Sequence, residues 1–199
     1  MPGRNRLPLA LLAGVLLAAC DGGGGGTGLG DPARYTVVPL GTLAGATGQP
    51  EPFFPDAVNN AGQVAGTTPS SAIGLWSGGA AVRVARTGAA QDLNEAGTLV
   101  GRDALSGAFV ATSAALQVLS GTGVRSWATG INDAGRVVGY GTQTSGVRAF
   151  LWSGGTLTLL EHASFPNSFA AAINETGQVA GAGLRQLCTS VPEGALCAD

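Results

Sequence analysis

The chain has 199 residues, of which 34 are glycine, and only 11% are charged. Hydrophobic residues make up 45% of the sequence, so its bulk is not a disordered polyelectrolyte, and the length suffices for one domain with a sizeable core. The ten arginines are scattered singly and the formal net charge is −2, whereas nucleic-acid binding requires a concentrated cationic face. We therefore expect no nucleic-acid partner.

The first nineteen residues have the pattern of an export signal. Two arginines and no acidic residue occur in residues 1–6, and an apolar run, Leu7–Ala19, follows. A basic segment followed by about 7–15 apolar residues is typical of a signal peptide, and such a run is too short to span a bilayer as a helix. Residues 1–19 are therefore predicted to be a signal peptide.

The residues around Cys20 predict attachment to a membrane. The sequence Leu17-Ala18-Ala19-Cys20 resembles the lipobox of bacterial lipoproteins, which implies that Cys20 is acylated and becomes the new N-terminus. The alternative is an ordinary secretory peptide with a cysteine nearby. Residues 20–34 are rich in glycine and are typical of a flexible tether. We expect a lipid-anchored protein of the bacterial cell envelope, on the periplasmic side or at the cell surface.

Residues 35–199 are predicted to form a repeat domain. Four segments align without gaps and share an asparagine, a glycine three residues later and a second glycine seven residues after the asparagine. The segments are Ala57–Gly66, Asp92–Gly101, Gly130–Gly139 and Ala172–Gly181. Self-similarity at a spacing of about 40 residues is typical of propeller blades or other repeat arrays.

The repeated segment is expected to be a β-hairpin. A type I turn favours asparagine at its first position and glycine three residues later. The asparagine side chain hydrogen-bonds to the nearby backbone, and glycine accepts a positive φ. We expect the second glycine to end the outgoing strand. The turn residues are Asn59 and Gly62, Asn94 and Gly97, Asn132 and Gly135, and Asn174 and Gly177.

A second hairpin follows each of the first three segments. It is clearest in Arg148–Trp152 and Thr156–Leu160, two apolar runs that a glycine-containing turn separates. Two hairpins per unit make a four-stranded antiparallel sheet, so the fold class is all-β and β-propeller-like. We expect four blades, with Tyr35–Leu43 as an N-terminal strand that completes the sheet of Ala172–Gly181. The alternative is an open array with exposed end strands.

These segments resemble bacterial extracellular HAF-repeat proteins, whose units read A-I-N-x-x-G-Q-V-V-G followed by H-A-F-L-W. The resemblance covers about Tyr35 to Gly181. The chain departs from it at the histidine, because Arg148 stands there in the third unit and the first two units also lack it. The resemblance therefore implies the repeat fold, and it implies no biochemical activity.

Cys188 and Cys197 are expected to form a disulfide, because export leads to an oxidising compartment and Cys20 carries lipid. His162, the only histidine, is expected to be a solvated loop residue. No metal site is expected. The residue after the turn asparagine is an acid in the last three units, Glu95, Asp133 and Glu175, and is Asn60 in the first unit. We interpret these acids as polar residues at the tips of the turns rather than as Ca²⁺ ligands.

No cofactor is expected either. Gly23, Gly25 and Gly28 match the dinucleotide-binding pattern G-x-G-x-x-G, but that pattern is meaningful only after a strand and before a helix, and these glycines lie in the tether. Trp76 and Trp152 occupy the same repeat position and are expected to pack between sheets, with a sugar-stacking role as the alternative.

The sequence thus predicts a non-enzymatic scaffold or binding module, anchored to a membrane and with an envelope protein or a glycan as its partner. A carbohydrate-binding or carbohydrate-active protein is the alternative. A third hypothesis is a short array that functions only as an oligomer.

Overall fold

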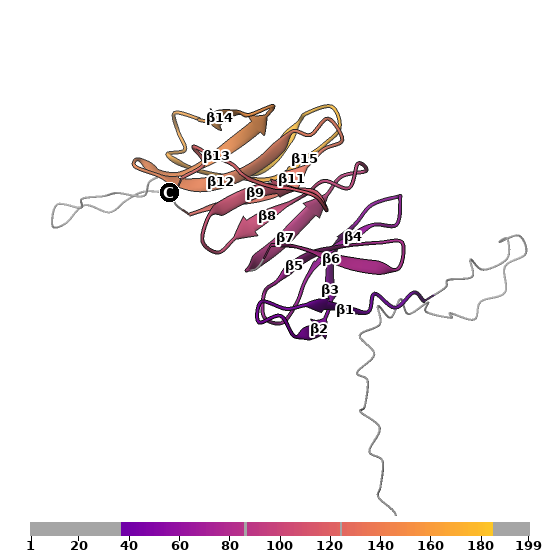
Figure 1. Ribbon diagram of the computed structural model, residues 1–199. Coiled ribbons are helices and arrows are strands. Elements are labelled where there is room, and N and C mark those ends of the chain that lie inside the picture. The colour runs from indigo at the N-terminus through magenta and orange to yellow at the C-terminus, as the bar shows by residue number, and fades with distance from the viewer. Residues whose placement is uncertain (1–36, 86, 124, 185–199) are drawn as a thin grey trace, which may run out of the picture.

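The computed structural model describes residues 37–85, 87–123 and 125–184 (Figure 1). These residues form β-strands and no helix, so none of them belongs to a helix that could cross a membrane. The strands are β1 Thr42–Ala44, β2 Pro50–Pro52, β3 Phe54–Val58, β4 Val64–Thr67, β5 Ile73–Ser77, β6 Ala80–Ala85, β7 Gly88–Leu93, β8 Leu99–Asp103, β9 Gly107–Ala111, β10 Leu116–Val118, β11 Ser126–Ile131, β12 Val137–Gln143, β13 Gly146–Ser153, β14 Thr156–Leu160, β15 Asn167–Ile173 and β16 Val179–Leu184.

The strands form antiparallel meanders in which each strand pairs with its neighbour in sequence. Three sheets have four strands each: the first sheet is β3–β6, the second is β7–β10 and the third is β11–β14. Two hairpins flank them, the N-terminal hairpin β1–β2 and the terminal hairpin β15–β16. The predicted all-β fold with four-stranded repeat units is confirmed.

The sheets stack in chain order (Figure 1). The first strand of each unit packs on the first three strands of the preceding sheet: β7 lies against β3, β4 and β5, β11 against β7, β8 and β9, and β15 against β11, β12 and β13. Among the described residues the stack is open, with the N-terminal hairpin at one end and the terminal hairpin at the other.

The core lies between the sheets because neighbouring residues of a strand point to opposite faces, and both faces of the inner sheets are covered. In β8, Leu99 packs against the first sheet, and the adjacent Val100 packs against the third. In β12, Val137 and Val138 divide in the same way between the second sheet and the terminal hairpin. This two-sided burial explains the short continuous apolar runs of the repeat.

The N-terminal strand differs from its prediction. Residues 37–41 are not in a strand, and Thr42–Ala44 pairs with Pro50–Pro52 rather than with the terminal hairpin. A tight turn favours this local pairing, since the Gly45 N–H donates to the Gln49 carbonyl at 2.8 Å and Gly48 takes a φ of +86°. Closing a loop of a few residues costs less entropy than pairing strands more than a hundred residues apart.

The second glycine of each repeat also differs from its prediction, because it lies inside the outgoing strand and does not end it. Each first strand has a β-bulge opposite this glycine, for example between Ala128 and Gly130 in β11. A Cβ at Gly139 would collide with the Trp127 carbonyl, and equivalent collisions with a first-strand carbonyl occur at Gly66, Gly101 and Gly181. Glycine is therefore required by the close approach of the bulged backbone.

The two equivalent tryptophans pack as expected toward the preceding element of the stack. Trp152 is 8% exposed and lies in the core between the second and third sheets. Trp76 has no preceding four-stranded sheet and packs instead against Leu43 and Phe53 of the N-terminal segment. Its buried indole N–H has no hydrogen-bond partner among the described residues. The interpretation of both as packing residues is confirmed.

Glu51 in β2 joins the N-terminal hairpin to the first sheet, and we expect this contact to depend on pH. Hydrogen bonding by the Ser70 hydroxyl, and then by its backbone N–H at 3.0 Å, lowers the pKa of Glu51 from its ordinary value of 4.5. The ionised form is the one stabilised, so the contribution is complete above pH 4.5 and is lost as the pH falls through the lower pKa of the folded protein.

Glu51→Gln should therefore lower the melting temperature at neutral pH and have a diminishing effect in acid. Thermal unfolding of both proteins across this pH range measures the difference. A difference in melting temperature that stayed constant with pH would contradict the assignment.

Candidate functional site

The four repeat turns share one geometry, which confirms the predicted type of hairpin. In the third unit, the Asn132 carbonyl accepts from the Gly135 N–H at 2.9 Å, and the Asn132 Oδ1 accepts from the Arg136 N–H at 3.0 Å. The first turn glycines have φ between +71° and +85°, which favours glycine. These are Gly62, Gly97, Gly135 and Gly177.

The asparagines also join one turn to the next. The side-chain Nδ2 of Asn59 donates to the Asn94 carbonyl at 2.9 Å, and the Nδ2 of Asn94 donates to the Asn132 carbonyl at 3.2 Å. The Nδ2 of Asn132 continues the series to the Asn174 carbonyl at 3.1 Å. We call these three bonds the asparagine ladder. Because Asn59, Asn94 and Asn132 are buried, the bonds satisfy groups that would otherwise lose water without a partner.

A second series of bonds uses the residue after each asparagine. The Glu95 carboxylate accepts from the Asn60 backbone N–H at 3.1 Å, and the Asp133 carboxylate accepts from the Glu95 N–H at 2.8 Å. The Glu175 carboxylate accepts from the Asp133 N–H at 3.0 Å. Each acid therefore binds the preceding turn. The interpretation of these acids as polar tip residues was incomplete, since they are also contacts between repeats.

This use of the acids accounts for Asn60. In the second, third and fourth units the position holds an acid that accepts a bond from the preceding repeat turn, whereas Asn59 and Asn60 belong to the first repeat turn of the described residues. The described residues contain no group of three or more side chains that could hold a metal ion. The hydrogen bonds between turns make the turn residues a structural element that joins successive sheets.

A row of stacked side chains crosses the second sheet, the third sheet and the terminal hairpin. The Arg102 guanidinium carbon lies 4.7 Å from the Trp127 ring centroid. Trp127 stacks on Tyr140 at 5.1 Å with an angle of 21° between the rings, and Tyr140 meets Phe169 edge-on at 5.0 Å. We call Arg102, Trp127, Tyr140 and Phe169 the aromatic row; all four side chains are half-buried.

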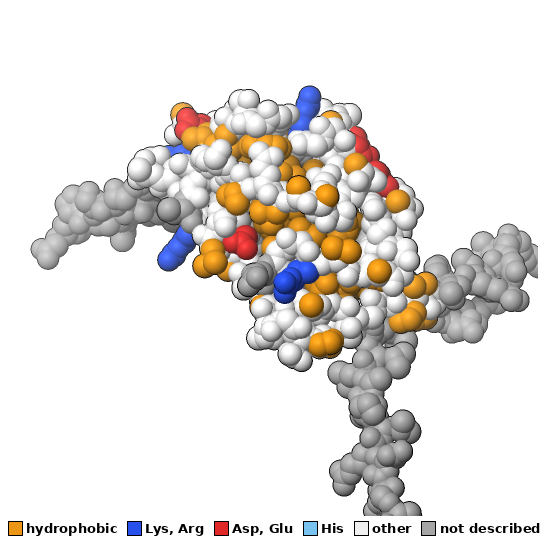
Figure 2. Space-filling view, viewed as in Figure 1, with side chains coloured by type: hydrophobic (Ala, Val, Ile, Leu, Met, Phe, Trp, Pro, Cys, Tyr) orange, Lys and Arg blue, Asp and Glu red, His pale blue; other side chains and the backbone are white. Residues whose placement is uncertain are grey.

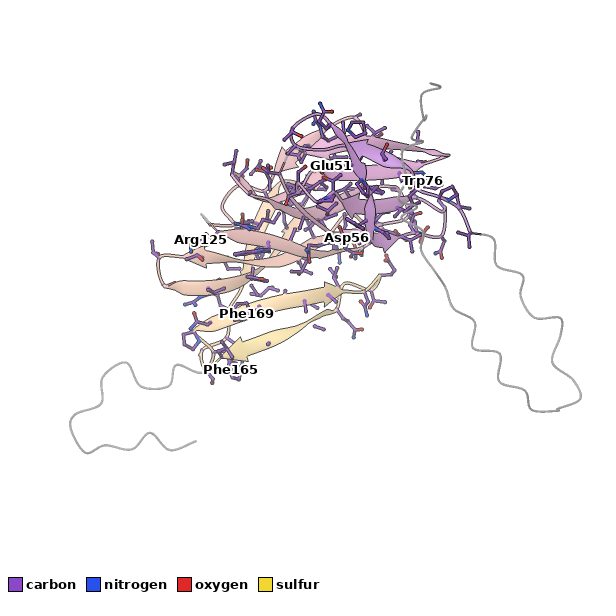
Figure 3. All side chains as sticks on the ribbon, turned by 90° about the horizontal axis from the view of Figure 1, so that it is seen from below. Glu51, Asp56, Trp76, Arg125, Phe165 and Phe169 are labelled. Carbon is purple, nitrogen blue, oxygen red and sulfur yellow. The ribbon has the colours of Figure 1, made fainter. Side chains whose placement is uncertain are left out.

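The repeat itself positions this row. Arg102 and Tyr140 each follow the second glycine of a unit, and Trp127 and Phe169 are the second or third residues of the next first strands. Trp127 and Tyr140 are directly opposite each other in β11 and β12, where cross-strand side chains contact. Figure 3 shows Phe169 on the terminal hairpin, beside the third sheet.

A polar cleft of about 420 Å³ adjoins the Arg102 end of the row. Its lining combines the indole of Trp127 and the guanidinium of Arg102 with hydroxyl and amide groups. The polar side chains are Ser70, Ser71, Thr87 and Gln91. An aromatic ring with hydrogen-bonding groups around it can hold a flat polar ligand, because stacking and hydrogen bonds are satisfied together.

The remaining predicted site residues lie elsewhere. His162 is exposed, and its Nδ1 accepts from the Ser164 N–H at 3.2 Å, so the prediction of a solvated loop histidine is confirmed. Cys20, Cys188 and Cys197 lie outside the described residues, and their predicted lipidation and disulfide stay predictions.

Comparison of the chain with protein-family models, with curated protein sequences and with solved structures gave no match. The resemblance to HAF-repeat proteins and to bacterial lipoproteins therefore stays a prediction.

Sequence reasoning did not find the aromatic row. Trp127 stood outside the positions shared by the repeats, and the residue after each second glycine differs from unit to unit: Thr67, Arg102, Tyr140 and Ala182. The available signal was the alternation of side chains in a β-strand, which places that position on the same face of successive sheets.

Proposed function

We propose that this chain is a lipid-anchored protein of a bacterial envelope whose β-sheet stack is a non-enzymatic scaffold or binding module. The observation that supports this proposal is the bonding between turns, which joins successive sheets and so holds the aromatic row in a preformed arrangement. Preformed surfaces bind with a smaller loss of conformational entropy. The four-stranded meanders have the size of propeller blades, and a propeller-like arrangement of them is part of the proposal.

The surface suits binding more than chemistry. Apolar side chains gather along the middle of the face in Figure 2, and the charged side chains there are few and lie apart. The row presents aromatic rings and one guanidinium, which are groups that recognise partners by stacking and charge. Turnover of a hydrolase substrate by the purified chain, lost on changing Glu161 or His162, would contradict a non-enzymatic role.

Anchoring is tested at Cys20. The Cys20→Ser variant lacks the thiol that acylation requires, so we expect it in the soluble fraction, whereas the native chain should sediment with membranes. Fractionation followed by immunoblotting measures the distribution, and Cys188→Ser is the matched control that should leave it unchanged. Native and Cys20→Ser chains found equally in the membrane fraction would contradict the lipid anchor.

A carbohydrate ligand is the second candidate, and the cleft beside Trp127 is the observation that favours it. Sugar rings present apolar C–H groups that pack on indole, together with hydroxyls that pair with polar groups such as Ser70, Thr87 and Gln91. In this proposal the sugar contacts the part of the Trp127 indole that lines the cleft, and Arg102 and Tyr140, which already lie against the ring, hold it in place.

The Trp127→Ala variant should weaken glycan binding by about tenfold, because an aromatic contact contributes on the order of 1–1.5 kcal/mol. A glycan array identifies the ligand, and calorimetric titration of the best one compares the variants. Phe54→Ala is the control, since Phe54 is an exposed aromatic residue of the first strand of the first sheet. An array without any bound glycan at high protein concentration would contradict this candidate and leave the scaffold proposal intact.

A further inference from the structure

Among the described residues, the second strand of the terminal hairpin has an unpaired edge, whereas the second strands of the three four-stranded units do not. β4, β8 and β12 are the strands equivalent to β16, and each of them pairs with a strand on both sides. Among the described residues, β16 pairs only with β15. All six residues of β16 are exposed, whereas the first three of β4, β8 and β12 are buried.

A groove of about 420 Å³ lies beside this edge. Its lining is mostly apolar and includes Leu160 from the third sheet, Phe165, Phe169, Val179 and Gly181, with His162 and Ser168 as its polar side chains. Figure 3 shows Phe165 and Phe169 at the terminal hairpin, at one end of the stack. An unpaired strand edge with an apolar groove beside it is the geometry to which extended peptides add by β-augmentation.

The other units show what fills the equivalent place. In the third sheet, β13 pairs with β12 and places Phe150 opposite Gly139, with the ring 2.7 Å from where a glycine Cβ would lie. In the second sheet, β9 likewise places Phe109 opposite Gly101. In the first sheet, β5 places Gly74 opposite Gly66, and the ring 2.7 Å from the equivalent point belongs to Phe53, which precedes β3. Gly181 is the equivalent glycine of the terminal hairpin, and it is exposed.

We propose that β16 is the acceptor edge for an extended strand of another polypeptide, which seats an aromatic side chain over Gly181. The partner strand pairs antiparallel with β16, as β13 does with β12, and carries apolar residues at alternate positions. This inference goes beyond the proposed function, because it names a polypeptide partner for a surface that a glycan at the cleft beside Trp127 would not use.

A second copy of the chain fits this groove less well. Among the described residues, the edge strands of a copy that contain an aromatic residue are β3, β11 and β15. Trp127 in β11 and Phe169 in β15 already pack in the aromatic row. In β3, Pro55 directly follows Phe54 and has no N–H to donate, and proline at a sheet edge opposes the pairing of a further strand.

A peptide with the sequence of Gly146–Ser153 is the probe, because it is the strand that fills this place in the third sheet. Labelled peptide is titrated into the full-length Cys20→Ser chain, with fluorescence anisotropy as the readout. We expect saturable binding and slower hydrogen exchange at the β16 amides. A peptide carrying Phe150→Asp should bind at least about tenfold more weakly, since it cannot seat an apolar ring.

Val179→Arg in the chain should also weaken binding at least about tenfold, because it places a charge in the groove. Val179 is 36% exposed, so the variant should fold, and Val58→Arg at the opposite end of the stack is the matched control that should bind as the unchanged chain does. Absence of saturable binding, or equal binding by the Val179→Arg variant, would overturn the proposal.

Two further outcomes would assign the groove to other occupants and so also overturn it. One is peptide binding to a chain that ends at Leu184 but not to the full chain, which would show that residues 185–199 compete for the edge. The other is a dimer, detected by light scattering, that dissociates when Val179→Arg is introduced.

Discussion

Replacing Phe150 by alanine is expected to lower the free energy of unfolding by about 3–5 kcal/mol, the usual cost of removing a buried aromatic side chain. Phe150 has no exposed surface and lies in the core between the second and third sheets. Its ring lies against the backbone at Gly139, where no side chain can move in to fill the space, because a Cβ there would collide with the Trp127 carbonyl. The cavity would therefore persist and the full cost would apply.

Chemical denaturation of the two proteins measures this loss. Phe54→Ala is the matched control: the same change at a side chain that is 49% exposed should cost about 1.5 kcal/mol or less. In a domain of this size the Phe150 variant should also melt roughly 6–20 °C lower. Equal losses for the two variants would contradict the placement of Phe150 in the core.

Asn132→Ala is expected to lower the free energy of unfolding by about 2–3 kcal/mol, because it removes two hydrogen bonds from a buried site. Asn132 is 1% exposed. Its Oδ1 accepts from the Arg136 N–H within the turn, and its Nδ2 donates to the Asn174 carbonyl of the next turn. The Arg136 N–H would lose this partner, and the Asn174 carbonyl would keep only the bond from the Gly177 N–H within its own turn.

Asn174→Ala is the control for this prediction, since Asn174 holds the same position in the last turn and is exposed. Among the described residues, its side chain bonds only to Thr176 and Gln178 of its own hairpin, so we expect a loss below about 1 kcal/mol. Asn132→Asp keeps the acceptor within the turn and removes the donor to the next turn. Asn132→Asp should therefore lower the free energy of unfolding more than Asn174→Asp does. Equal decreases for the two variants, or a smaller one for Asn132→Asp, would contradict the asparagine ladder.

The hairpins could be predicted from the sequence because their determinants are local. Asparagine and glycine at a fixed spacing specify the turn, and β-favouring residues on both sides specify the strands, so the four turns lie where the repeats predicted them. The packing role of Trp152 was also predictable, because equivalent positions in successive sheets each face the preceding element of the stack.

Contacts between units could not be predicted in the same way. Spacing within one turn shows that Asn94 bonds its own backbone, but it does not show which turn lies beside it, and the ladder depends on that neighbour. The recurring acids at Glu95, Asp133 and Glu175 were the available signal, together with Asn60 in the first unit. Their carboxylates accept hydrogen bonds from the preceding turn, so the recurrence of acids at this position indicates contact between successive turns rather than exposure to solvent.

The N-terminal strand was mispredicted because two pairings compete for it. Val37 and Val38 favour a strand, but Pro39 interrupts the run, and the turn after Ala44 makes a local hairpin available at low entropic cost. A ring closed by this strand would have required it to reach the terminal hairpin, which lies at the other end of the stack (Figure 1).

Each repeat turn is hydrogen-bonded to the next, whereas among the described residues the backbone N–H of Glu175 in the last turn has no such bond. Amide hydrogen exchange at the four residues that follow the turn asparagines is the most direct test of this arrangement. The N–H groups of Asn60, Glu95 and Asp133 donate to the acid of the next turn, and no described group accepts from Glu175. Nuclear magnetic resonance should show slow exchange at the first three amides and fast exchange at Glu175. Four amides that exchange equally fast, or a Glu175 amide as protected as the others, would contradict the account.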